Sequence, residues 1–383
     1  MTAHPRSDPA SPAAGDAYTP PPQDLVPLAR AFVPLSALRP SYLQFLLQQA
    51  SVDYLCAGQP LFDRGVCDYR HIFLLHGRVR LRYSSGYEEL VSAGDTLFAL
   101  ANEMPRPCDA VADSDCTLLK LDSDRLDRIL SWCQIGDYLL AELSVERDYD
   151  EDMEWIRTVL NSNLFYKVPP VNAERILDRM TPQVVMAGEV ILRQGEIGNC
   201  CYFIKEGSAR VTHRDEEGRV THLADIGVGR CFGEDALVYE TLRNATVTML
   251  EDGVLMRLGK EDFKVLLIEP EVEEVSEDEA QSLAGEPVYI DVRTQEEYDE
   301  GHLVLAANVP LNLLSLKKRL LRTDVPYVLY CDTGRRSRAA AWLLGKQGYN
   351  TLALRGGLVG AGMQYQLVRD QSYMLREGRV LKG

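Results

Sequence analysis

The hydrophobic pattern divides the chain into an unpatterned start and two kinds of patterned region. Residues 1–23 are rich in Pro, Ala, Ser and Asp and hold few apolar side chains. So little apolar surface cannot offset the conformational entropy lost on folding, and we expect a disordered tail. From residue 24 to about residue 268, short stretches of alternating hydrophobic and polar residues are separated by glycines, a pattern typical of strands with one buried face.

The alternating region contains one pattern twice, 130 residues apart. The matches are Ala57-Gly58 with Ala187-Gly188, Gly65 with Gly195, Phe73 with Phe203, and Gly77 with Gly207. Because the spacing is constant, we expect the two copies to share one fold. In each copy a helix follows a proline, over Tyr42 to Ala50 and over Asn172 to Met180. The strands that follow predict a small antiparallel, jelly-roll-like β-barrel.

Residues 122–162, between the two copies, show hydrophobic positions at helical spacing. These positions are Leu126, Ile129, Leu130, Tyr138, Leu139, Leu143, Trp155, Ile156, Val159 and Leu160. The polar residues between them are largely acidic. We therefore predict a long acidic helix on the surface.

A run of acidic residues ends the repeated region. Residues 269–279 read EPEVEEVSEDE, which predicts a solvated linker that leads into the first helix of another domain. Beyond it, apolar strands at 288–290, 307–309, 327–330 and 351–354 alternate with helical segments around 296–300, 313–321 and 337–346. That alternation predicts a compact α/β domain with a mainly parallel sheet.

The expected organisation is therefore multidomain, with α+β and α/β parts. We expect the tail over residues 1–23, the first copy over 24–134, connecting helices over 135–167, the second copy over 168–268, and the α/β domain over 269–383.

Composition and charge exclude several classes of partner. The formal net charge of −16 disfavours non-specific binding to nucleic acid and docking on anionic lipid, because both need an electropositive face. The sequence has no apolar run of the roughly 20 residues that cross a bilayer and no signal-peptide pattern, so we expect a cytoplasmic protein. Its nine cysteines show neither metal-ligand spacing nor a disulfide framework, and we expect no metal and no covalent cofactor.

One cysteine, Cys331, has the surroundings of a nucleophile. It follows the strand at 327–330 and precedes the loop Asp332-Thr333-Gly334-Arg335-Arg336 and a helix. Free backbone N–H groups and the positive end of a helix dipole meet at such a position and stabilise a thiolate. Since Arg335 and Arg336 add positive charge, we predict that the thiol pKa falls from about 8.5 toward neutrality or below. The alternative, a buried core cysteine, is disfavoured by the glycine and the two arginines.

Residues from about 275 to 358 resemble the rhodanese family. The shared motifs are Ile290-Asp291-Val292-Arg293, Glu296-Glu297-Tyr298, Gly301-His302-Leu303, Asn308-Val309-Pro310, the Cys-x-x-Gly-x-Arg loop and Leu354-Arg355-Gly356-Gly357. The resemblance implies that Cys331 accepts a sulfane sulfur from a donor such as thiosulfate and passes it to cyanide or a thiol. The catalytic set that it implies is Cys331, Gly334, Arg335, Arg336, Asp291 and Arg293, with a structural ion pair as the alternative role for the last two.

The spacing within the loop separates this segment from related phosphatases. Only four residues lie between Cys331 and Arg336, one fewer than in those enzymes, so the cradle suits a persulfide better than a phosphate ester. Two positions depart from the rhodanese pattern. Leu305 stands where the family usually has glycine, and no tryptophan follows Gly356-Gly357.

The second copy carries a candidate phosphate site. Phe232-Gly233-Glu234-Asp235-Ala236-Leu237 is followed by Arg243-Asn244-Ala245. A glycine turn that opens a short helical turn offers N–H groups to an anion, an arginine chelates a phosphate, and a carboxylate accepts ribose hydroxyl protons. A pair formed by Glu234 and Arg243 without any ligand is the structural alternative.

Residues 168–268 resemble the cyclic-nucleotide-binding domain family, including Gly188-Glu189, Gln194-Gly195-Glu196 and Gly207. The resemblance implies that Arg243 binds the cyclic phosphate, that Glu234 binds the ribose 2′-hydroxyl, and that the N–H groups of Ala236 and Leu237 complete the cradle. Gly233, Asn244 and Ala245 belong to the same site. Asp235 weakens phosphate binding unless it points away, and Asn244 leaves the choice between cyclic AMP and cyclic GMP open.

The first copy lacks this set of residues. Between Gly94 and Arg106 there is no Gly-Glu pair, and the segment is two residues shorter than the one from Gly229 to Arg243. Since Arg106 alone cannot build a phosphate pocket, we expect a degenerate domain used for packing or for forming a homodimer.

The leading functional hypothesis is a sulfurtransferase regulated by cyclic AMP or cyclic GMP bound at 168–268. The alternative is a nucleotide-binding protein whose Cys331 carries persulfide or senses oxidants with little turnover. No helix-turn-helix pattern follows the second copy, so we expect no nucleic acid partner and no membrane partner.

Overall fold

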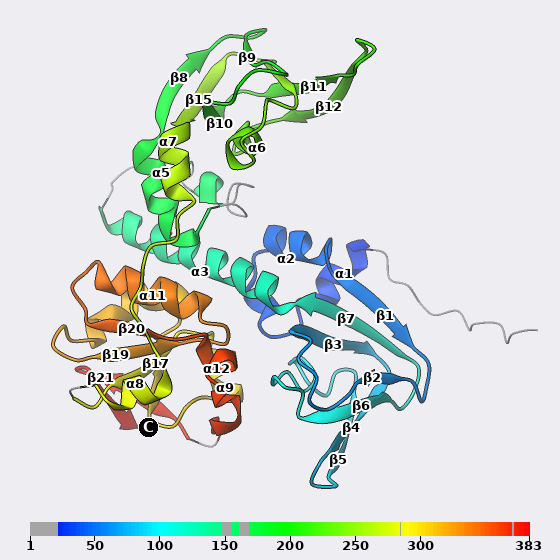
Figure 1. Ribbon diagram of the computed structural model, residues 1–383, viewed down its shortest axis with the longest axis vertical. Helices are drawn as coiled ribbons and strands as arrows, with labels where there is room; N and C mark the ends of the chain where they lie inside the picture. Colours follow the sequence, from blue (N-terminus) through cyan, green and yellow to red (C-terminus); the bar gives the residue numbers. More distant parts are fainter. Residues whose placement is uncertain (1–21, 147–154, 156, 161–167, 284, 370) are drawn as a thin grey trace, which may run out of the picture. The chain divides into compact units, whose positions relative to one another are not determined.

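A computed structural model describes residues 22–146, 155, 157–160, 168–283, 285–369 and 371–383 (Figure 1). The described residues divide into two compact units, one of residues 22–36 and 43–121 and one of residues 37–42 and those from 122 onward. The predicted tail lies outside the described residues except for Pro22 and Gln23. These two residues begin helix α1 (Pro22–Ala29), and proline suits the first position of a helix because its missing N–H has no intrahelical partner there.

The first copy consists of two antiparallel sheets. One has the order β1 (Ser51–Leu55), β7 (Cys116–Asp122), β3 (Arg70–His76), and the other has the order β2 (Pro60–Phe62), β6 (Cys108–Ala112), β4 (Arg78–Tyr83), β5 (Glu88–Ser92). Alternate residues of both sheets, among them Ile72, Val79 and Leu118, form one buried core. Helix α2 (Pro40–Leu47) is the predicted helix after Pro40.

The second copy repeats this arrangement. Its sheets have the orders β13 (Cys231–Phe232), β10 (Cys200–Glu206), β15 (Gly253–Gly259), β8 (Thr181–Val185) and β12 (Val220–Ile226), β11 (Ala209–Arg214), β14 (Thr246–Met249), β9 (Val190–Leu192). Strands β1, β2 and β3 recur as β8, β9 and β10 at the predicted spacing of 130 residues. The jelly-roll-like prediction is confirmed, but a closed barrel is not, because no described strand pairs with members of both sheets.

Short helices complete the second copy. A 3-10 turn, η3 (Pro170–Asn172), leads into α5 (Ala173–Arg179), α6 (Glu234–Val238) follows β13, and α7 (Lys260–Leu266) follows β15. Gly233 has φ 85° and precedes α6, so the predicted glycine turn that opens a helical turn is present. Only glycine adopts this left-handed conformation at little cost.

Helix α3 (Ser123–Glu146) is central in the second unit, which corrects the expected surface helix. Of the predicted hydrophobic positions, Leu126, Ile129, Leu130, Tyr138 and Leu139 are buried. The polar residues Asp127, Ser131 and Gln134 are buried as well. Additional apolar residues, including Trp132, Cys133 and Ile135, widen the apolar stripe around much of the helix. A helix that is apolar on more than one face packs against neighbours on more than one side.

The C-terminal part contains the predicted parallel sheet, with the order β16 (Glu274–Val275), β20 (Thr351–Leu354), β19 (Tyr327–Tyr330), β17 (Val288–Asp291), β18 (Ala306–Asn308). All four neighbouring pairs are parallel. The connecting elements are α8 (Glu277–Gln281), α9 (Gln295–Glu300), η4 (Leu311–Leu313), α10 (Leu314–Lys317), η5 (Lys318–Leu320), α11 (Arg335–Gly345) and α12 (Gly357–Gly360). The sequence did not reveal β16, within the acidic segment, or the terminal hairpin of β21 (Tyr373–Arg376) and β22 (Arg379–Lys382).

Candidate functional sites

Cys331 lies between the last residue of β19 and the loop that opens α11. Its side chain is fully buried. The backbone N–H of Gly334 donates a hydrogen bond to Sγ over 3.2 Å, and Ser337 Oγ lies 3.7 Å from Sγ. Gly334 has φ 91° and is the residue before α11, so the loop turns back and directs its N–H groups toward the sulfur. The geometry is that of a sulfur atom held at a helix N-terminus.

Gly357 fixes the loop from the other side. The N–H of Leu358 donates to the carbonyl oxygen of Cys331, and the N–H of Val359 donates to that of Asp332, both over 2.9 Å. A Cβ atom on Gly357 would lie 2.5 Å from the Cys331 carbonyl oxygen and 2.5 Å from the Gly334 nitrogen. With φ +62° as well, this position accepts only glycine without displacement of the loop.

Arg336 is buried among carboxylates. It donates hydrogen bonds of 2.7 and 2.8 Å to the two oxygens of Glu297, and its Nε lies 2.8 Å from Asp127 Oδ1 in an ion pair. Asp332 lies 3.3 Å away. Glu297 belongs to a motif shared with the rhodanese family, but neither Glu297 nor Asp127 was predicted to lie at this site. Glu297 had a signal, the capping box that it forms with Thr294 at the start of α9, whereas Asp127 lies on α3 and had none.

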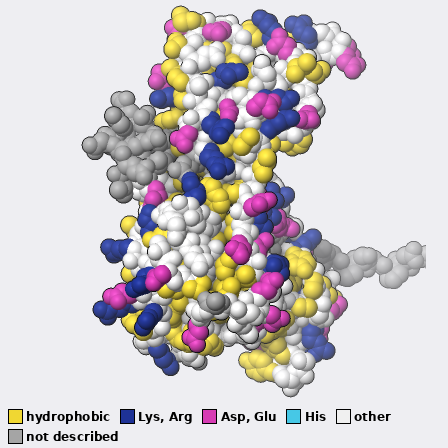
Figure 2. Space-filling model, turned by 60° about the vertical axis from the view of Figure 1, so that its left-hand side comes forward, with side chains coloured by type: hydrophobic (Ala, Val, Ile, Leu, Met, Phe, Trp, Pro, Cys, Tyr) yellow, Lys and Arg dark blue, Asp and Glu magenta, His cyan; other side chains and the backbone are white. Residues whose placement is uncertain are grey.

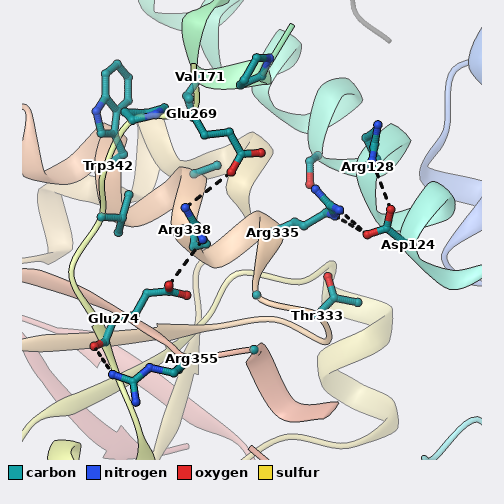
Figure 3. Close-up of a pocket in the computed structure, with 17 residues that line it drawn as sticks. Asp124, Arg128, Val171, Glu269, Glu274, Thr333, Arg335, Arg338, Trp342 and Arg355 are labelled. Atoms are coloured by element: carbon teal, nitrogen blue, oxygen red, sulfur yellow. Dashed lines mark hydrogen bonds and ion pairs between the residues drawn. The ribbon is translucent and has the colours of Figure 1, made fainter. Parts of the chain in front are cut away.

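The other predicted residues of this site divide into two groups. Arg335 points toward α3, where its Nε donates to Asp124 Oδ1 over 2.8 Å (Figure 3). Arg293 donates to both oxygens of the fully buried Asp291 and forms an ion pair of 3.1 Å with Asp332. Asp291 and Arg293 are therefore placed as a structural ion pair that reaches the loop through Asp332.

The candidate phosphate site is assembled around Gly233. Arg243 is 4% exposed, and its guanidinium donates hydrogen bonds of 2.6 Å to the carbonyl oxygens of Gly233 and Cys200. Glu234, 6% exposed, begins α6, and Ala236 and Leu237 follow it in the same helix. The remaining predicted residues, Asn244 and Ala245, lie between Arg243 and β14, where the Asn244 carbonyl contacts His213 Nδ1 over 2.9 Å and Ala245 is buried.

Two family descriptions match the chain. "Cyclic nucleotide-binding domain" matches residues 52–131 and 182–269, and "Rhodanese-like domain" matches residues 276–362. The chain carries two cyclic nucleotide-binding domains followed by a rhodanese-like domain. Both resemblances drawn from the sequence are thereby confirmed.

Curated relatives are similar to part of the chain. A cyclic nucleotide-gated potassium channel of Rhizobium etli is 34% identical over 125 residues, which are 32% of this chain and 34% of the relative. The cAMP-dependent protein kinase regulatory subunit of Blastocladiella emersonii is 30% identical over 178 residues, 46% of this chain and 41% of the relative. The chain thus spans less than half the length of these relatives. A solved regulatory domain of Toxoplasma gondii PKA with cAMP aligns with 21% identity and a TM-score of 0.28, covering 64% of this chain and 92% of that one.

The two nucleotide-binding domains differ at one decisive position. Arg106 and Arg243 are equivalent, since the carbonyl oxygen of each accepts a hydrogen bond from the glycine of the preceding turn, Gly65 or Gly195. In the first domain Asp68 forms an ion pair of 2.8 Å with Arg106. In the second domain the position 130 residues after Asp68 is Gly198. The first domain therefore supplies its own carboxylate to the arginine, whereas the second leaves that place without a side chain.

The surroundings of Cys331 raise the pKa of its thiol, so the predicted fall in this pKa is wrong. Burial, and next the charge of Asp127, raise the pKa of Cys331 to about 11, although Arg336 lowers it in part. The prediction counted the two arginines of the loop as free charges. Instead, Arg336 is shared by Glu297 and Asp127, and Arg335 is paired with Asp124.

A pocket of about 550 Å³ adjoins the loop within the second unit (Figure 3). Thr333, Gly334 and Gly356 line it, together with Trp342 and charged side chains from α3, α11 and the acidic segment. Arg338 lies between Glu269 and Glu274, at 3.5 and 3.4 Å. The arginines of this pocket therefore have acidic partners, and its wall is mixed in charge.

Other site types have little support in the described part of the chain. No group of three or more His, Cys, Asp and Glu side chains there could hold a metal ion. No helix in these residues has the length and apolar character needed to cross a membrane. On the face shown in Figure 2, basic and acidic side chains are interspersed, so this face offers no continuous basic surface of the kind that binds nucleic acid.

Proposed function

We propose that the chain is a rhodanese-type sulfurtransferase that transfers sulfur through a persulfide on Cys331. The observation that carries the proposal is the position of this sulfur, at the end of β19 and 3.2 Å from the N–H of Gly334. A cysteine that only filled the core would not need a helix N-terminus turned toward its sulfur. The match to the rhodanese-like family over residues 276–362 supports the same reading.

The reaction consists of two displacements at sulfur. The Cys331 thiolate attacks the outer sulfur of thiosulfate, a new S–S bond forms, and the bond between the two thiosulfate sulfurs breaks. Sulfite leaves with the electron pair. Cyanide or a thiolate then attacks the outer sulfur of the persulfide, and the electrons of the broken bond return to Cys331 as the thiolate. Loop N–H groups stabilise the negative charge on the outer sulfur between the two steps.

Steady-state assays with thiosulfate and cyanide test this function. Cys331→Ser should abolish thiocyanate formation while the protein stays folded. Cys201→Ser, which alters another fully buried cysteine, is the matched control and should retain activity. Turnover that survives in folded Cys331→Ser would exclude the assignment. One equivalent of persulfide on wild-type protein, without turnover, would favour the alternative of a persulfide carrier or sensor.

We infer further that the second nucleotide-binding domain binds one cyclic AMP or cyclic GMP as an effector. The supporting observation is the contrast between Gly198 beside Arg243 and Asp68 beside Arg106. A free anion and the Asp68 carboxylate would compete for the same guanidinium, so the first domain is proposed to bind no nucleotide. The similarity to a cyclic nucleotide-gated potassium channel and to a cAMP-dependent protein kinase regulatory subunit supports a cyclic nucleotide as the ligand.

Calorimetry with either nucleotide tests the effector site. Arg243→Ala should lose binding, whereas Arg106→Ala, which also removes a buried arginine, should keep it. A stoichiometry of one per chain is expected in the wild type. Absence of heat at millimolar concentration of both nucleotides would favour a scaffold role for both domains.

A further inference from the structure

The first turns of α3 present two carboxylates to the loop after Cys331. Asp124 accepts a hydrogen bond from Arg335, and Asp127 lies 2.8 Å from Arg336 Nε and accepts a hydrogen bond from Thr333 Oγ1. Arg335 and Asp124 are 211 positions apart in the sequence, and Thr333 and Asp127 are 206 positions apart. Helix α3 therefore holds three of the side chains that lie between Cys331 and the body of α11.

The Asp127 carboxylate stands where an anion would bind this loop. Its side chain is 5% exposed, and its two oxygens face Arg336 and Thr333. An anionic sulfur donor needs the same cation as it approaches Cys331, so donor and carboxylate compete. Because Cys331 is fully buried, no donor reaches the sulfur until some part of this arrangement moves.

Charged groups from several elements act on Cys331. Asp127 of α3 and Asp332 of the loop raise the pKa of its thiol, whereas Arg336 of α11 lowers it. Glu297 of α9 pairs with Arg336, and Arg293 after β17 pairs with Asp332. Asp127 is the strongest of the charges that act on the sulfur, and it acts against ionisation. The same carboxylate therefore both blocks the approach of an anion and suppresses the nucleophile.

Helix α3 is also tied to the second nucleotide-binding domain. The amide of Asn172, a fully buried residue of η3, donates to the carbonyl oxygens of Leu266 and Ile268 at the end of α7, over 2.9 and 2.8 Å. The 3-10 turn η3 packs on α3. Trp132 of α3 and Phe263 of α7 share one core. Direct packing thus connects α7 to the helix that carries Asp127.

We propose that α3 is an inhibitory cap on the sulfurtransferase site, in which Asp127 keeps the Cys331 loop closed until cyclic nucleotide, bound at the second domain, moves α7 and η3. Regulation by the nucleotide rests on the proposed function. The closed cap itself is tested by the rate at which Cys331 is alkylated, which does not depend on sulfur transfer.

Alkylation of Cys331 by iodoacetamide, followed by peptide mass spectrometry on the full chain, tests the cap. Asp127→Asn keeps the size of the side chain and removes the negative charge that opposes ionisation of Cys331. We expect the thiol pKa to fall by about one unit, which raises the thiolate fraction and the alkylation rate about 10-fold relative to wild type. The matched control is Asp137→Asn on the same helix, where the carboxylate pairs with Arg39 and is 42% exposed. Cys56 and Cys67, both exposed, serve as internal references.

Equal alkylation of Cys331 in wild type and in folded Asp127→Asn would overturn the cap. If Asp127→Asn does not fold, Thr333→Val is tested instead. It removes a hydrogen bond to Asp127 and should accelerate alkylation of Cys331 several-fold. An unchanged alkylation rate in Thr333→Val would likewise overturn the cap. Faster alkylation without thiosulfate turnover in any variant would uphold the cap and reject the sulfurtransferase. Saturating cyclic AMP or cyclic GMP should accelerate alkylation of Cys331 several-fold in wild type but not in Arg243→Ala. An unchanged alkylation rate with nucleotide bound would overturn the proposal that nucleotide opens the cap.

Discussion

Arg336 and Glu297, 39 positions apart, form a buried pair with two hydrogen bonds, of 2.7 and 2.8 Å. The pair joins the start of α11 to α9. Although burial opposes ionisation of Glu297, the charge and hydrogen bonds of Arg336 hold its pKa down at about 2. Arg336 therefore contributes to the packing of the domain as well as to the loop after Cys331.

Arg336→Ala should lower the free energy of unfolding by about 3 to 5 kcal/mol, because it leaves buried carboxylates without a cation. The neighbouring Arg335→Ala is the matched control, since its partner Asp124 is 53% exposed, and it should cost less than about 1 kcal/mol. Urea denaturation followed by circular dichroism measures both. Equal losses in the two variants would contradict the assignment of a structural role to Arg336.

Gly357→Ala should displace the Cys331 loop. The added Cβ would meet the Cys331 carbonyl oxygen and the Gly334 nitrogen at 2.5 Å, so we expect a loss of roughly 100-fold in kcat/KM, equivalent to about 2.7 kcal/mol. Gly348→Ala is the control, since its φ is also positive, +84°, but no atom lies within 4 Å of the added Cβ. Similar activity of the two variants would show that the loop tolerates the shift.

Asp332 gives the stability a dependence on mildly acidic pH. Burial raises the pKa of its carboxyl from 3.8 to about 6 against the opposing effect of Arg293. Between pH 3.8 and about 6 the carboxyl ionises more readily in the unfolded chain than in the folded protein. The folded state is therefore at its most stable, as far as Asp332 is concerned, below pH 3.8, and it loses this stability as the pH rises through about 6. Relative to Asp332→Asn, the wild type should therefore lose about 2 kcal/mol over this range, somewhat below the full linkage value because the side chain is 26% exposed. Denaturation at pH 4 and pH 7 measures the difference, and a constant difference would refute it.

Gly198→Asp should convert the second nucleotide-binding domain toward the state of the first. A Cβ at this position would lie 2.9 Å from the Ala236 Cβ and 3.2 Å from one guanidinium nitrogen of Arg243. The side chain would therefore crowd α6, and its carboxylate would pair with Arg243 as Asp68 pairs with Arg106. We expect nucleotide affinity to fall at least about 10-fold, equivalent to about 1.4 kcal/mol. Gly227→Asp, where the Cβ has no neighbour within 4 Å, adds the same charge as a control. Unaltered nucleotide affinity in Gly198→Asp would show that the Asp68–Arg106 ion pair is not what prevents nucleotide binding in the first domain.

The elements that alternate or repeat locally could be predicted from the sequence. Strands β17, β19 and β20 lie where the apolar stretches predicted them, because a buried parallel strand is a short hydrophobic run with clear ends. The glycines of the repeat kept their register because they sit in turns with φ near 85°. Leu305, noted as a departure from the family glycine, has φ 59°, and the chain tolerates this left-handed conformation at a modest energetic cost.

The contacts that decide the state of the site could not be predicted. Asp127 and Arg336 are far apart in the sequence, and nothing in the local pattern of α3 distinguishes Asp127 from the exposed Asp124 three residues earlier. The predicted pKa of Cys331 was wrong for the same reason, since it depends on burial and on a carboxylate from another domain. Local chemistry singled out Cys331, whereas the tertiary structure sets the pKa of its thiol.

The core that contains α3 limits how this chain can be divided. Trp132, Phe263 and Leu314, from three different segments, belong to one hydrophobic cluster, and α3 packs on η4, α10 and α11. A polypeptide that began at residue 276 would contain the whole rhodanese-like match and yet expose the apolar surface that α3 covers. Such a fragment should therefore aggregate, because α3 supplies part of the apolar packing that covers the rhodanese-like segment.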